Sequence, residues 1–116
     1  MTVKRKRVKT TNPLWYACIY RDMVRAARRL GYALALHGSM QKDFDVIAIP
    51  WREQRVASPA KLLEVIALTA GGVVAKGWTR KPHGRLAATI ILSGDLYIDL
   101  GVMPKGAGMN STEEGI

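Results

Sequence analysis

Three aspartates and a Gly-Ser pair are the residues of this chain best suited to chemistry. Asp43 and Asp45 are one residue apart, so on a strand both side chains point to the same face of the sheet. Asp99 lies within a later apolar stretch, residues 96–103. Neighbouring carboxylates repel each other unless a cation or a shared proton lies between them. The pattern therefore indicates a site for a divalent metal ion, with phosphate held beside the Gly-Ser turn at residues 38–39.

The size and composition of the chain favour one small folded domain with a basic N-terminal arm. The chain has 116 residues and one cysteine, Cys18, so it contains no intramolecular disulfide. Its net charge is +9, and much of the excess lies in residues 1–11, which we expect to form a disordered basic arm. No apolar stretch is long enough to span a membrane, and a cytoplasmic location follows as the expectation.

Two segments have the signals of helices. Asn12-Pro13 places a capping residue before a proline, and apolar residues then recur at three- and four-residue spacing as far as Gly31. Ser58-Pro59 repeats the same start signal, and Gly71-Gly72 ends the apolar helix that follows. Both helices are predicted to cover a sheet.

The remaining apolar segments read as strands. They are residues 32–36, 44–51, 73–78, 86–92 and 96–103, with a short hairpin connection at residues 93–95. Helices and strands in this order predict an α+β domain over residues 12–104, with two helices on one face of a mixed, mostly antiparallel sheet of four to five strands. Residues 105–116 are predicted to be a disordered tail. Alternation places Asp99 on the face opposite the helices, away from Ile98 and Leu100.

The same residues carry a resemblance to the nucleotidyltransferase superfamily, with its DNA polymerase beta-like fold. In that family a Gly-Ser turn follows a helix and a strand, an Asp-x-Asp pair lies on the next strand, and a third acid lies on a later strand. Here the order is Gly38-Ser39, Asp43-Phe44-Asp45-Val46 and Tyr97-Ile98-Asp99-Leu100. The similarity covers residues 12–104, and the chain also resembles small uncharacterised bacteriophage proteins.

This resemblance implies a minimal enzyme that transfers a nucleotidyl group from an NTP to a hydroxyl acceptor. Asp43, Asp45 and Asp99 would bind Mg²⁺ or Mn²⁺, and Asp99 would also be the catalytic base. The residues expected at the nucleotide phosphates are Gly38, Ser39, Lys42, His83 and Arg85. His37, directly before the turn, is assigned a structural role.

A second interpretation treats the chain as a catalytically silent module that binds nucleic acid or an acidic host protein. Only three residues separate Ser39 from Asp43, a shorter segment than is usual in the family. The basic arm would make the contact through Lys4, Arg5, Lys6, Arg7 and Lys9, and an arginine-rich helix face would extend it through Arg21, Arg25, Arg28 and Arg29. Tyr32, Trp51 and Trp78 are assigned to core or rim packing, with stacking on a base as the alternative.

Overall fold

The fold consists of two helices and one mixed sheet. The computed structural model describes residues 4–38, 43–75, 77–93 and 96–104, with the backbone alone for residues 4–13 and Asp43. The elements are α1 (Lys4–Arg29), β1 (Tyr32–His37), β2 (Asp43–Pro50), α2 (Pro59–Ala70), β3 (Val73–Val74), β4 (Thr79–Arg80), the 3₁₀ turn η1 (Pro82–Gly84), β5 (Leu86–Ile91) and β6 (Tyr97–Val102). The predicted α+β class is confirmed.

Strand order in the sheet brings the two aspartate-bearing strands together. The order is β1-β2-β6-β5-β3, with β4 also paired to β5. Strands β2 and β6 are parallel, whereas every other pair is antiparallel. The predicted mixed and mostly antiparallel sheet is therefore confirmed. Within the described residues it has six strands rather than four to five, because Thr79–Arg80 forms a two-residue strand that the sequence did not predict.

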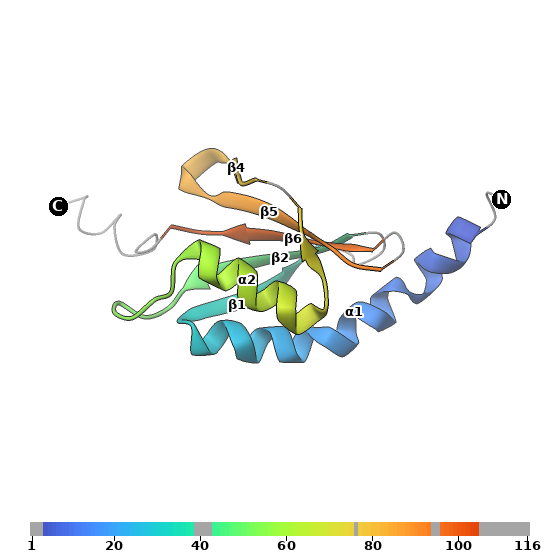
Figure 1. Ribbon diagram of the computed structural model, residues 1–116, viewed down its shortest axis with the longest axis horizontal. Coiled ribbons are helices and arrows are strands. Elements are labelled where there is room, and N and C mark those ends of the chain that lie inside the picture. The colour runs from blue at the N-terminus through green and yellow to red at the C-terminus, as the bar shows by residue number, and fades with distance from the viewer. Residues whose placement is uncertain (1–3, 39–42, 76, 94–95, 105–116) are drawn as a thin grey trace.

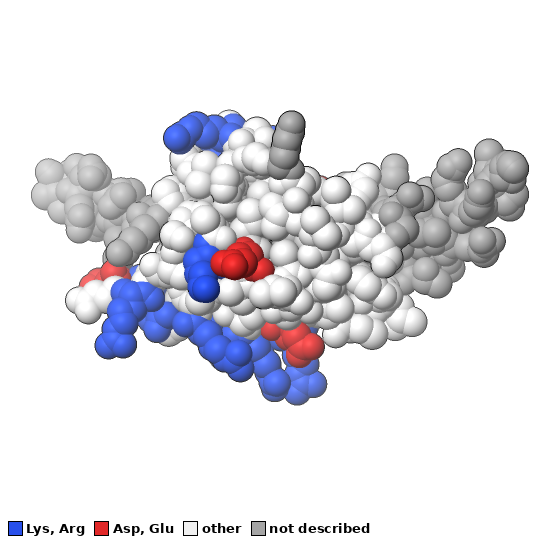
Figure 2. All heavy atoms as spheres, in the orientation of Figure 1, with Lys and Arg blue, Asp and Glu red and all other residues white. Residues whose placement is uncertain are grey.

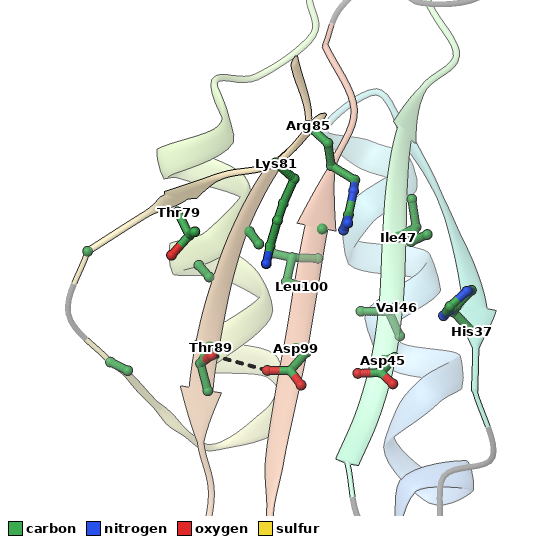
Figure 3. Close-up of a pocket in the computed structure, with 15 residues that line it drawn as sticks. His37, Asp45, Val46, Ile47, Thr79, Lys81, Arg85, Thr89, Asp99 and Leu100 are labelled. Carbon is green, nitrogen blue, oxygen red and sulfur yellow. Dashed lines mark hydrogen bonds between the residues drawn. The ribbon is translucent and has the colours of Figure 1, made fainter. Parts of the chain in front are cut away.

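The two faces of the sheet differ sharply in burial. Alternate residues of the central strands are buried in one core with the helices; they are Phe44, Val46, Ala48, Ala88, Ile90, Ile98, Leu100 and Val102. From α1, Tyr16 and Met23 enter the same core, and the Tyr16 ring stacks on Phe44 with 4.6 Å between centroids. Both helices lie behind the sheet in the view of Figure 3. On the opposite face, which we call the uncovered face, the side chains of Asp45, Ile47, Thr89 and Asp99 are only partly buried.

Helix α2 begins and ends where its sequence signals predicted. The Ser58 hydroxyl accepts a hydrogen bond from the Lys61 amide at 3.2 Å, and Pro59 occupies the first turn. At the other end Gly71 has φ +76, the left-handed conformation that glycine tolerates, and it closes the helix.

Helix α1 is longer than the sequence predicted. Its backbone begins at Lys4, so most of the expected basic arm forms the first turns of the helix instead. Pro13 removes one amide donor, and the lysines and arginines before it have high helix propensity, so a helix can continue through this point. Figure 1 shows this first part of α1 extending beyond the sheet. Within the described residues, neither helix is long and apolar enough to cross a membrane.

Candidate functional site

A row of four polar residues crosses the uncovered face of the sheet. His37 in β1 pairs with Asp45 in β2, Asp45 pairs with Asp99 in β6, and Asp99 pairs with Thr89 in β5. All four are register partners, so they lie on successive strands about 4.8 Å apart. In Figure 3 the four side chains lie on the side of the sheet away from the helices.

The centre of this row is the pair Asp45 and Asp99, which we call the acid pair. Both residues are only partly buried. The Thr89 hydroxyl donates a hydrogen bond to Asp99 Oδ1 at 3.1 Å, which orients that carboxylate (Figure 3). The parallel pairing of β2 with β6 is what brings these two distant segments side by side.

Gly38 lies directly against the acid pair. It has φ +89, and a Cβ atom at this position would lie 2.9 Å from Asp45 Oδ2. The left-handed backbone favours glycine at this position, and a Cβ atom here would force the Asp45 carboxylate to shift. The turn expected to hold phosphate thus begins in contact with an acid expected to hold metal.

Two cations, Lys81 and Arg85, form a second like-charged pair, which we call the cation pair. The Lys81 amide donates to the Arg85 carbonyl at 2.8 Å across the turn that contains η1, so the two residues face each other at the base of the β4–β5 hairpin. The Arg85 side chain lies across β6, where a Cβ atom on Gly101 would be 2.7 Å from its Nη1. Figure 3 shows both cationic side chains extending along the groove toward the acid pair.

The two pairs line one groove of about 610 Å³. Its floor comes from β2, β6 and β5, its walls include Thr79 and Gly77, and His37 lies at the β1 side. Like charges on adjacent strands destabilise a sheet, as in the acid pair. The cation pair lies just beyond the ends of β4 and β5. Two pairs of opposite sign in one groove are suited to a ligand that carries both a cation and an anion.

The donor set of the acid pair suits a hard divalent cation, which prefers carboxylate oxygens. Among the residues with described side chains, no group of three or more His, Cys, Asp or Glu is placed to hold a metal ion. The third predicted ligand, Asp43, pairs in β2 with Tyr97, next to the row of four, and its side chain lies outside the described residues.

The other predicted site residues divide into three groups. Arg85 lines the groove, and Gly38 does not line it but lies against Asp45, which does. His83 is exposed in η1 with φ +65 and is not among the residues that line the groove. Ser39 and Lys42 lie outside the described residues, and of Lys4, Arg5, Lys6, Arg7 and Lys9 only the helical backbone is described.

The sequence pattern gives no binding role to three residues at the groove. Lys81 lies outside the predicted helices and strands, and Thr89 lies in the strand predicted at residues 86–92. A signal for Thr89 exists, because counting outward from the centre of the hairpin connection at residues 93–95 places it opposite Asp99. The third residue is His37, for which the sequence predicts a structural role; its side chain is exposed and lines the groove.

Comparisons test whether known proteins share these features. A scan against protein-family models, a search of curated proteins and a search of solved structures each find no match for this chain.

Proposed function

We propose that the groove binds an NTP together with Mg²⁺ or Mn²⁺, and that the chain transfers the nucleotidyl group to a hydroxyl acceptor. The fold would then be a minimal form of the nucleotidyltransferase fold. The acid pair, with Asp43 beside it in β2, would hold the metal, and the cation pair, with the Gly38-Ser39 turn and Lys42, would hold the phosphates.

One observation carries this proposal: the acid pair and the cation pair occupy the same groove. Asp45 pairs with Asp99 across β2 and β6, and the Lys81 amide donates to the Arg85 carbonyl, so each pair brings two residues of like charge together. Neither Lys81 nor Arg85 forms an ion pair within the described residues. A metal-bound polyphosphate suits both pairs at once, because its cation would meet the carboxylates while its oxygens would meet the ammonium and guanidinium groups.

The chemistry assigns a distinct task to each side chain. When bound, the metal supplies a Lewis acid that lowers the pKa of an acceptor hydroxyl and stabilises negative charge on phosphate. Asp99, oriented by Thr89, would accept the hydroxyl proton on Oδ2. The acceptor oxygen forms a bond to the α-phosphorus, the bond from that phosphorus to the bridging oxygen breaks, and pyrophosphate leaves. Lys81 and Arg85 would stabilise the charge that develops on the leaving group.

Thermal unfolding with Mn²⁺ and non-hydrolysable NTP analogues tests binding at the groove. Ligand at a hundredfold excess over its Kd stabilises a protein by about 2.7 kcal/mol, which gives a clear rise in Tm. We expect Asp45→Asn and Asp99→Asn to abolish this rise. Asp22→Asn is the matched control, because Asp22 is an exposed aspartate on α1 outside the groove. Equal shifts in all four proteins would contradict the proposal.

A glycine variant separates the phosphate contact from the metal contact. Gly101→Ala places a Cβ atom where Arg85 now lies, and the flexible arginine must move away. We expect weaker binding of the NTP analogue, with the response to Mn²⁺ alone unchanged. Loss of the Mn²⁺ response in this variant would indicate that the two pairs are not separate binding groups.

Product analysis then distinguishes transfer from simple sequestration of a nucleotide. Transfer releases pyrophosphate and adds the mass of a nucleoside monophosphate to the acceptor, so mass spectrometry detects both. Binding without pyrophosphate release would identify a nucleotide-sequestering protein in which the groove is retained without turnover.

A further inference from the structure

A second charged surface lies along α1, separate from the groove. Arg21, Arg25, Arg28 and Arg29 are all exposed on this helix, and Asp22 is the one acid between Leu14 and Arg29. Within the described residues none of the four arginines forms an ion pair. Figure 2 shows Lys and Arg side chains gathered in a row along the lower edge of the molecule, over α1.

This basic row ends at an exposed tryptophan. Trp51, directly after β2, is 55% exposed, a large fraction for an indole ring. Arg28 and Trp51 line the same hollow of about 540 Å³, whose apolar walls include Val24 and Ala33. None of the residues that line this hollow also lines the groove.

The loop after β2 holds Trp51 against the end of α1. The Trp51 amide donates to the Gly31 carbonyl at 3.0 Å. Arg52 Nη2 donates to the Arg29 carbonyl at 3.0 Å and to the Arg55 carbonyl at 3.1 Å, and its guanidinium lies 5.3 Å from the centre of the Trp51 ring. The backbone of Trp51 is therefore held at the end of α1, and its indole lies against the anchored Arg52 guanidinium.

We propose that this surface, formed by Arg21, Arg25, Arg28 and Trp51, binds single-stranded nucleic acid without sequence preference. Successive arginines of the row rise about 4.5–6 Å along the helix, which allows each one to reach a different phosphate. Trp51 supplies a platform for one unpaired base at the end of the row. Cationic grooves with exposed aromatic rings are the usual means of binding single strands.

The exposed indole is the reason for choosing nucleic acid over an acidic protein. Arginines alone attract any polyanion, and the long-range attraction does not discriminate between phosphates and carboxylates. The aromatic ring of a base stacks on an indole face, whereas the carboxylate side chains of Asp and Glu have no ring that could stack there. The hollow beside Trp51 provides the room that a stacked base needs.

Fluorescence anisotropy with the full chain and labelled oligothymidylate or oligouridylate tests the proposal over a range of salt concentrations. We expect Arg25→Ala/Arg28→Ala to weaken binding and to reduce the slope of log K against log salt by about 1.4, since each lost phosphate contact on a single strand contributes about 0.7. Trp51→Ala should weaken binding about 5- to 100-fold with the slope unchanged, and Trp51→Phe should retain most of the affinity.

Two controls make the result decisive. Lys61→Ala/Arg80→Ala removes the same charge from exposed positions on α2 and β4, and it should leave the affinity close to that of the parent chain. Competition with polyglutamate should be far weaker than with unlabelled oligonucleotide. The proposal is overturned if the control weakens binding as much as the α1 variant, if Trp51→Ala has no effect in a folded protein, or if polyglutamate competes equally well. Asp99→Asn should leave the affinity for the oligonucleotide unchanged. The oligonucleotide assay therefore tests the surface on α1 independently of the groove.

Discussion

Adjacent residues on one strand of this protein have opposite roles, because the two faces of the sheet are built differently. On β6, Ile98 and Leu100 are fully buried against the helices, whereas Asp99 between them points into the groove. The covered face is apolar and tightly packed. The uncovered face brings like charges together and so gives up stability at the groove, as binding sites commonly do.

The two charged surfaces differ in a similar way. The groove combines acids and cations over a sheet floor, and we assign it to a metal-bound nucleotide. The surface on α1 is almost purely basic and ends at an indole, and we assign it to a single strand. Four substitutions test the contrast between the two faces of the sheet.

The largest expected effect is in the covered face. Leu100→Ala should lower the free energy of unfolding by about 2–5 kcal/mol, since it removes buried methyl groups and leaves a cavity. Urea unfolding measures this change. A loss below about 1 kcal/mol would mean that the covered face is not the close-packed core described here.

Gly38→Ala should have the next largest effect, with a cost of about 1–3 kcal/mol for strain at a left-handed residue. The new methyl group would also displace the Asp45 carboxylate, so the response to Mn²⁺ should weaken. Gly71→Ala is the matched control, because Gly71 has φ +76 but open space around its Cβ position. It should cost stability and leave the Mn²⁺ response unchanged; equal Mn²⁺ responses in the two variants would refute the close contact with Asp45.

Tyr32→Phe probes a buried polar group of the covered face, where the hydroxyl donates to the Ala57 carbonyl at 2.7 Å. Its loss should cost about 0.5–1.5 kcal/mol. Burial raises the pKa of Tyr32 above its usual 10.0, so the folded state holds the proton more tightly than the unfolded state. The stability from this group is therefore complete below pH 10 and falls as the pH rises through the folded-state pKa. The variant should show a shallower decline of stability in alkali, measured by unfolding at a series of pH values.

The smallest expected change has the opposite sign. Asp99→Asn keeps an oxygen that can accept the Thr89 hydrogen bond and removes the repulsion within the acid pair. We expect a gain of roughly 0.2–1 kcal/mol in the absence of metal, together with loss of the Mn²⁺ response. A clear loss of stability would show that the acid pair is not repulsive in the folded protein.

Much of the fold was predictable because its signals are local. The Ser58-Pro59 and Gly71 signals gave the ends of α2, and alternation gave the correct face for Asp99. The longer α1 was missed because Pro13 reads as a start signal, and β4 was missed because two residues are too few to show a pattern. The place of Lys81 could not be predicted either, since only the tight turn around η1 brings it opposite Arg85.

The amino-acid sequence by itself determined which side of each strand a residue occupies, because side chains alternate along any strand whatever its neighbours are. Tertiary structure alone decided which strands become neighbours. The insertion of β6 between β2 and β5, parallel to β2, depends on how the whole apolar face packs against the two helices. That choice placed Asp45 beside Asp99, and no local pattern in either segment encodes it.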